Sequence, residues 1–259
     1  MSNYEQTFAT VNLKKDLPEI PILHICHLSG QGIGPLSYNN SMTKFTDLGG
    51  TVFMVSQNQF NVRNKMANRI LHRDLEVSGT LSPAFCTGKE YVNQEIEYPV
   101  ITIGRISMSK NAFWLHKKSQ PVNLHSLVIT GKVKEYLKKE KDYNYYLSNA
   151  DWKYPQETKF DLNHDKVLDC LSKSGVYVST CADESFGITA LEALSHGCPL
   201  LLLSATDSHS SECIPSDPSH YHLISSKIKS DEFLTLVKKM TLPLEMRIEI
   251  SELTKENTQ

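Results

Sequence analysis

The sequence predicts an α/β fold with a mostly parallel sheet, and two observations predict it. The stretch 175–205 alternates strand, helix and strand: β-forming residues at 176–178, apolar residues at helical spacing over 188–194, and an unbroken apolar run at 200–203. Two parallel strands joined by one helix form a βαβ unit, which is almost always right-handed. Further strand and helix patterns alternate from residue 99 onward, as expected for helices packed on the faces of a parallel sheet.

The first hundred residues contain fewer such elements. Residues 1–19 are polar and mixed, and we expect them to form an arm. Strands are predicted at 20–26 and 51–56, and helices at 40–48 and 58–75. The segment that follows, up to Tyr98, has no clear periodicity.

The later residues supply the main sheet. Strands are expected at 100–103 and 126–130, in addition to those of the stretch 175–205, and helices at 111–118, 166–172 and 230–240. Residues 206–226 read as a polar loop. We therefore expect a reduced N-terminal α/β domain at 1–98, a Rossmann-like domain at 99–240 and a polar C-terminal tail at 241–259.

Composition is that of an ordinary globular protein. Of the 259 residues, 40% are hydrophobic and 22% are charged, and the net charge of −2 gives no global attraction to nucleic acid or anionic membranes. The six cysteines form no CxxC pair, which favours buried thiols in a reducing compartment over disulfides or a zinc site. The polar start and the lack of any apolar run of about 20 residues predict neither a signal peptide nor a transmembrane segment, so we expect a cytoplasmic protein.

Two acidic residues mark the loop and helix of the βαβ stretch. A helix start presents unpaired N–H groups and partial positive charge, which suit phosphate or sugar oxygens, and Gly187 allows close approach to the backbone. Glu184 and Glu192 have no obvious basic partner nearby, and each carboxylate suits a pair of sugar hydroxyls. For the two glutamates alone, an ordinary helix with one dipole-facing acid and one solvated acid is the favoured reading.

The complete string ESFGITALEAL, followed by Gly-Cys-Pro and an apolar strand, strongly resembles the donor-site signature of family-4 retaining glycosyltransferases, which have the GT-B fold. The resemblance implies that Glu184 binds hydroxyls of the donor sugar and that Glu192 binds the ribose of the nucleotide. It also implies a donor-facing loop and helix start made by Ser185, Phe186, Gly187 and Ile188.

A second likeness lies at the end of the strand 100–103. Gly104-Arg105, followed by Lys110, resembles the diphosphate grip of the same family, and the resemblance gives Arg105 and Lys110 catalytic roles. The chemistry requires fixed cations, because breaking a sugar–phosphate bond leaves a diphosphate with extra negative charge. Arginine offers a bidentate fork and lysine a point charge. No Asp-x-Asp motif is present, so we expect neither a metal ion nor another cofactor.

Histidine at the end of the first strand is a further catalytic candidate. In the family a histidine in this position lies in the interdomain cleft beside the donor sugar, and His27 matches it best, with His24 as the alternative. Taken alone, a strand histidine is more often a structural residue. In the loop 206–226, Glu212 is the acid that best matches the family.

The N-terminal part departs from the family pattern. Only about half of the usual Rossmann-like N-terminal domain precedes the second domain, and the opening strands with their glycine loop have no counterpart. Either this domain is reduced, or a second polypeptide completes it, or the chain is a gene fragment.

The resemblance implies a retaining hexosyl- or pentosyltransferase that moves a sugar from a nucleotide-sugar donor to an acceptor hydroxyl by front-face departure and attack. The acceptor would be a glycan. A fainter likeness to the T-even bacteriophage enzymes that glycosylate hydroxymethylcytosine in DNA would place the protein in the host cytoplasm. It rests on 171–175, on Gly104-Arg105 and Lys110, and on the lysine- and tyrosine-rich stretch 131–146. The rival interpretation is a non-catalytic or split-enzyme subunit that needs a partner chain.

Overall fold

The computed structural model describes residues 3–26, 34–80, 92–93, 95–104, 110–131, 156–181, 187–203 and 220–256. They belong to two compact units, the first built from residues up to 80 and the second from residues 92 onward. Within these ranges, none of the helices has the length and apolar character needed to cross a membrane.

The first unit is a small parallel sheet with three helices. Its strands lie in the order β1-β2-β3, and both neighbouring pairs are parallel. The core is apolar and includes Met42, Phe45, Val52 and Met54. In chain order the elements are α1 (Asn3–Asp16), β1 (Leu23–Cys26), α2 (Gly34–Asp47), β2 (Thr51–Met54), α3 (Gln57–Leu71) and β3 (Gly79–Thr80).

Helix α1 corrects the expectation of an arm at residues 1–19. The helix contributes Val11 to the core of the first unit. Lys14, almost fully buried, donates from Nζ to the carbonyls of Pro18 (2.7 Å) and Ile20 (2.9 Å), which secures the chain beyond the helix. The helix is only weakly amphipathic, so the sequence pattern did not reveal it.

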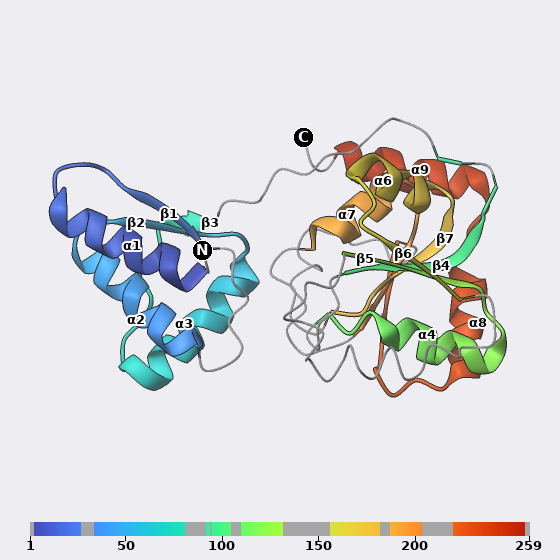
Figure 1. The fold of residues 1–259 in the computed structure, drawn as a ribbon, viewed down its shortest axis with the longest axis horizontal. Helices are drawn as coiled ribbons and strands as arrows, with labels where there is room; N and C mark the ends of the chain where they lie inside the picture. Colours follow the sequence, from blue (N-terminus) through green and yellow to red (C-terminus); the bar gives the residue numbers. More distant parts are fainter. Residues whose placement is uncertain are drawn as a thin grey trace. The chain divides into compact units, whose positions relative to one another are not determined.

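The second unit is built on a six-stranded sheet in the order β6-β5-β4-β7-β8-β9, and every neighbouring pair is parallel. This confirms the predicted parallel α/β architecture. Helices α6, α7 and α9 lie over one face of the sheet, and α4 and α8 over the other (Figure 1). The elements are β4 (Tyr98–Ile103), α4 (Phe113–Ser119), η1 (Gln120–Val122), β5 (Ser126–Thr130), β6 (Gln156–Phe160), α6 (His164–Ser172), β7 (Ser174–Ser179), α7 (Ile188–Ser195), β8 (Leu200–Leu203), β9 (Tyr221–Ile224), α8 (Ser230–Met240) and α9 (Leu244–Glu256).

Burial on both faces explains the apolar runs of the central strands. Leu200 and Leu202 belong to the core on one face, and Leu201 and Leu203 to the core on the other. Successive strand residues point to opposite faces, so a strand covered on both sides must be apolar throughout. The predicted strand at 200–203 and the predicted helix at 230–240 are both confirmed.

Two C-terminal expectations are wrong. Strand β9 lies inside the expected polar loop 206–226, and α9 occupies most of the expected tail 241–259. Strand β9 is the edge strand and leaves His222 and Leu223 exposed, so its pattern is weak. Helix α9 buries polar side chains, Arg247 foremost, that composition alone assigns to solvent.

The second unit has three cysteines in its described segments. Cys170, Cys181 and Cys198 are buried free thiols, as expected for small apolar residues. Burial raises the pKa of the Cys198 thiol to about 12, so this thiol stays protonated at neutral pH.

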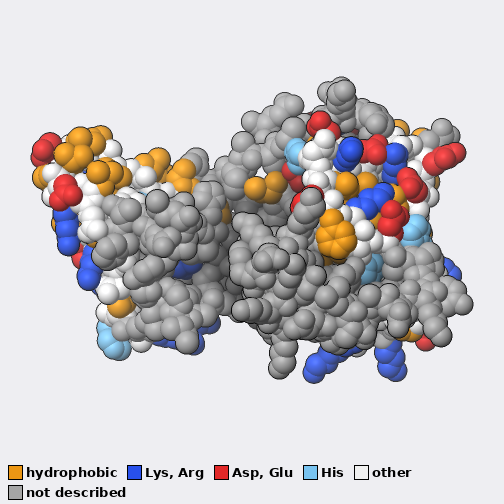
Figure 2. Space-filling view, viewed as in Figure 1, with side chains coloured by type: hydrophobic (Ala, Val, Ile, Leu, Met, Phe, Trp, Pro, Cys, Tyr) orange, Lys and Arg blue, Asp and Glu red, His pale blue; other side chains and the backbone are white. Residues whose placement is uncertain are grey.

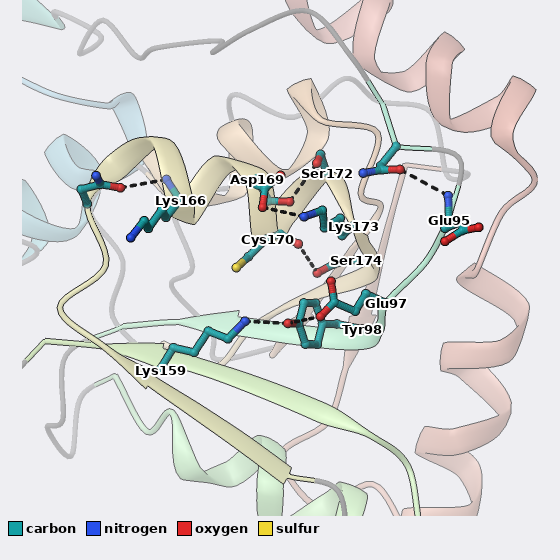
Figure 3. Close-up of polar contacts among 12 residues, drawn as sticks. Glu95, Glu97, Tyr98, Lys159, Lys166, Asp169, Cys170, Ser172, Lys173 and Ser174 are labelled. Carbon is teal, nitrogen blue, oxygen red and sulfur yellow. Dashed lines mark hydrogen bonds and ion pairs between the residues drawn. The ribbon is translucent and has the colours of Figure 1, made fainter.

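A polar network joins β4, β6 and the segment before β4 (Figure 3). Lys159 Nζ donates to the Tyr98 hydroxyl (2.6 Å), which in turn donates to Glu97 (2.5 Å). Burial, reinforced by the bond to Glu97, raises the pKa of the Tyr98 hydroxyl. A separate pair, Lys173 Nζ to Asp169 at 2.7 Å, closes the last turn of α6. Tyr98 begins β4, so we assign this network to sheet assembly.

Buried His116 makes the stability of the second unit pH-dependent. It contacts Ser126 Oγ (2.9 Å) and Thr158 Oγ1 (3.3 Å), and burial lowers the pKa of its imidazole from 6.5 to about 3. In the unfolded chain the imidazole of His116 takes up a proton below about pH 6.5. In the folded chain the same imidazole stays neutral down to about pH 3. Stability should therefore fall by about 1.4 kcal/mol per pH unit within that window. Urea unfolding between about pH 7 and pH 5 measures this slope; it should be shallower in His116→Gln and unchanged in the exposed control His222→Gln.

Candidate functional site

The order of the strands places a topological switch point between β4 and β7. From β4 the chain continues to β5 on one side of the sheet, and from β7 it continues to β8 on the other. Parallel sheets of this kind bind ligands outside the carboxyl ends of their strands at such a point. Here the two ends are Ile103, which is followed by Gly104, and Ser179, which is followed by Thr180.

Lys110 is fixed at this point by the strand ends. The Thr180 hydroxyl donates to the Lys110 carbonyl (2.7 Å), and the Thr102 and Thr180 hydroxyl oxygens lie 3.4 Å apart. The Lys110 side chain runs over Gly104: its Cβ and Cγ lie 3.5 and 3.9 Å from the place where a Cβ at position 104 would sit. The structure thus brings together Gly104 and Lys110, two of the three residues predicted to grip the diphosphate.

Helix α7 starts at the other side of the switch point. Gly187 caps it with a left-handed backbone (φ +85°), a conformation that glycine adopts without strain. Its carbonyl accepts from the amides of Ala190 (2.9 Å) and Leu191 (3.2 Å). The first amides of a helix have no intrahelical acceptor, so the turn beginning at Ile188 presents donors suited to an anion.

Glu192 is buried, which excludes the solvated acid that was the alternative interpretation. Only 7% of the residue is exposed, within a helix whose other buried members are alanine, leucine and serine. Its Oε1 lies 2.8 Å from Nε2 of His164, the first residue of α6. The expectation that Glu192 has no basic partner nearby is therefore wrong. Twenty-eight residues separate the pair, so only the packing of α6 on α7 brings them together.

The remaining predicted site residues lie outside the described residues, and their roles stay predictions. They are His27, Arg105, Glu184, Ser185, Phe186 and Glu212. Most of the basic stretch 131–146 lies outside as well. His24, the alternative to His27, lies in a described segment of the first unit. Its ring contacts that of Phe45 edge-on, with 6.2 Å between the two ring centroids.

Comparison with known proteins agrees with this geometry. Residues 90–214 match the family model "Glycosyl transferases group 1". Solved structures with the same fold include HepE from Anabaena in complex with UDP and glucose (TM-score 0.75, 11% identity, covering 99% of this chain and 71% of that one). The pneumococcal O-GlcNAc transferase GtfA, in complex with UDP and GlcNAc, gives a TM-score of 0.64 at 17% identity, and the match covers 95% of this chain and 52% of GtfA. TarM gives a TM-score of 0.67 at 15% identity, and the match covers 92% of this chain and 47% of TarM.

The chain therefore has the fold of the GT-B glycosyltransferases. It spans about half the length of GtfA and TarM. No curated protein matches it in sequence.

Proposed function

We propose that this chain is a retaining glycosyltransferase that uses a nucleotide-sugar donor and holds the donor at the carboxyl edge of β4 and β7. The observation that carries the proposal is that Lys110 and the start of α7 lie at one switch point, with the buried Glu192 in the second turn of that helix. All three lie within the segment 90–214 that matches the group 1 family model.

Each group has a distinct task in this proposal. Lys110, together with Arg105, neutralises the charge that develops on the departing diphosphate, and the first amides of α7 add their partial positive charge. Glu184 and Glu192 accept hydrogen bonds from the sugar and the ribose, respectively. Protein cations carry out the neutralisation, so the proposed reaction needs no divalent metal. The departing phosphate itself deprotonates the acceptor hydroxyl, which then attacks from the same face, with retention.

UDP is the nucleotide to test first, because UDP is present in the HepE and GtfA complexes. We propose a glycan as the acceptor, in a cytoplasmic setting. Hydroxymethylated cytosine in DNA remains the second candidate, and a transfer assay with both acceptors separates them.

A specific observation favours one alternative, a subunit that requires a partner chain. Strand β1 lies at the edge of the first sheet, and Leu23 on it is 54% exposed. Other exposed apolar residues precede it in sequence (Leu13, Leu17 and Ile20), and Figure 2 shows hydrophobic side chains gathered on part of the surface of this unit. Exposed apolar surface beside a strand edge is suited to pairing with another chain. A GtfA/B complex is among the solved structures with this fold.

Replacing Lys110 with alanine tests the proposed diphosphate grip. Loss of one charge-assisted contact should weaken the binding of UDP by about 1.5–3 kcal/mol, roughly ten- to a hundredfold. Calorimetric titration in EDTA measures the change, and Arg105→Ala should behave similarly. The control is Lys239→Ala, which removes an exposed cation near the end of α8. If Lys110→Ala binds UDP like the unmodified chain, the grip is assigned to the wrong residue.

A further inference from the structure

The contact between Glu192 and His164 is the best-defined polar contact of the site. Glu192 Oε1 lies 2.8 Å from His164 Nε2, a distance typical of a charge-assisted hydrogen bond. The two side chains differ in environment: that of Glu192 is 10% exposed and that of His164 is 50% exposed. The buried carboxylate therefore has a half-exposed histidine as its neighbour.

Both partners are held by rigid elements. His164 opens α6, whose cap residue Asn163 accepts from the Lys166 amide at 3.0 Å (Figure 3). Helix α6 buries Leu168 and Leu171 in the same core as Leu194 of α7. The separation of the two side chains is thus set by helix packing.

The carboxylate has capacity left after this contact. A carboxylate has two oxygens and about four lone-pair sites, and a buried one needs several donors. Among the described residues, His164 provides the one side-chain contact to it. Bonding at Oε1 fixes the side-chain rotamer and directs Oε2 elsewhere, and hydroxyl groups of a ligand are donors of the required kind.

We propose that His164 is a positioning residue: its hydrogen bond to Oε1 pre-orients Glu192, so that the carboxylate accepts hydrogen bonds from the ribose hydroxyls of the donor. This inference rests on the proposed function, which places the nucleotide at this site. Without His164 the glutamate must be ordered when the ligand binds, and that ordering reduces affinity.

The contribution of the ribose hydroxyls isolates this role. The tightest binder among UDP, GDP and ADP is titrated calorimetrically, together with the 2′,3′-dideoxy form of the same nucleotide. In His164→Ala we expect roughly tenfold weaker binding of the ribonucleotide and no change for the dideoxy form. His164→Gln, which retains an N–H donor of similar reach, should recover most of the loss. The exposed neighbour control, Asp165→Asn, should bind both ligands normally.

A double variant completes the test. If His164 acts through Glu192, adding His164→Ala to Glu192→Ala should not weaken the binding of the ribonucleotide any further. Equal losses for the ribonucleotide and its dideoxy form would overturn the positioning role, and so would unchanged binding in His164→Ala or an additive double variant. Binding by the unmodified chain reports separately on the proposed function: binding of none of the three nucleotides would contradict that function and this inference together.

Discussion

Replacing Arg247 with alanine is expected to lower the free energy of unfolding of the second unit by about 4 kcal/mol. Arg247, 1% exposed, donates to four backbone carbonyls: those of Gly197 (3.0 Å), Asn93 (2.9 Å), Ser172 (2.8 Å) and Ser174 (3.2 Å). It thereby ties α9 to the amino-terminal edge of the sheet. Alanine removes these donors and leaves buried acceptors without them, each of which carries a desolvation penalty.

The backbone of α9 packs closely against Gly197 at this point. Gly197 has φ +69°, and a Cβ there would lie 2.5 Å from the Arg247 carbonyl oxygen. Urea unfolding followed by tryptophan fluorescence reports on this unit, because Trp114 lies in its core. Glu249→Ala, an exposed change on the same helix, is the control and should stay within about 0.5 kcal/mol. A loss below about 1 kcal/mol in Arg247→Ala would show that the contacts to the carbonyls contribute little.

The second large effect is expected on ligand binding when Glu184 or Glu192 is replaced, and the ligand affected should differ between the two variants. Glu184→Gln should impair use of the intact nucleotide sugar and spare affinity for the free nucleoside diphosphate, because Glu184 is proposed to bind only the sugar. Glu192→Gln should weaken both ligands alike, since both contain the ribose. Each lost contact should cost about 1–3 kcal/mol, or roughly five- to 150-fold in the affected constant.

Calorimetric titration of both variants with nucleotide sugar and with free diphosphate measures these losses. Glutamine keeps the shape of the side chain and an acceptor for His164, so Glu192→Gln should remain folded, which a thermal melt checks. Equal losses of affinity in both variants for both ligands would refute the assignment of Glu184 to the sugar and Glu192 to the ribose.

The sequence predicted the centre of the second unit because that part obeys simple periodicities. Leu200 to Leu203 are apolar since both faces of β8 are covered, and α8 combines buried Phe233, Val237 and Met240 with an exposed polar face. Lys110 and Glu192 were predicted as site residues through the resemblance to the glycosyltransferase signature, because taken alone they have the pattern of a surface cation and an ordinary helix acid.

Long-range polar contacts were beyond that reasoning. Arg247 bonds carbonyls as far as 154 residues away, and His164 meets Glu192 across 28 residues. Neither produces a periodic pattern, and an arginine or a histidine is normally assigned to solvent. The two contacts become visible only when α6 and α9 are packed against α7 in space.

The most direct test of the account is turnover of a nucleotide sugar by the purified chain. We would incubate it with UDP-glucose and UDP-GlcNAc in EDTA, with and without glycan acceptors, and measure the release of UDP; Lys110→Ala and Glu192→Gln serve as matched controls. We predict UDP release without added metal, reduced at least tenfold in both variants. Tight UDP binding without release would favour the partner-dependent subunit. Absence of both binding and release, or equal release by the unmodified chain and both variants, would contradict a donor site at the carboxyl edge of β4 and β7.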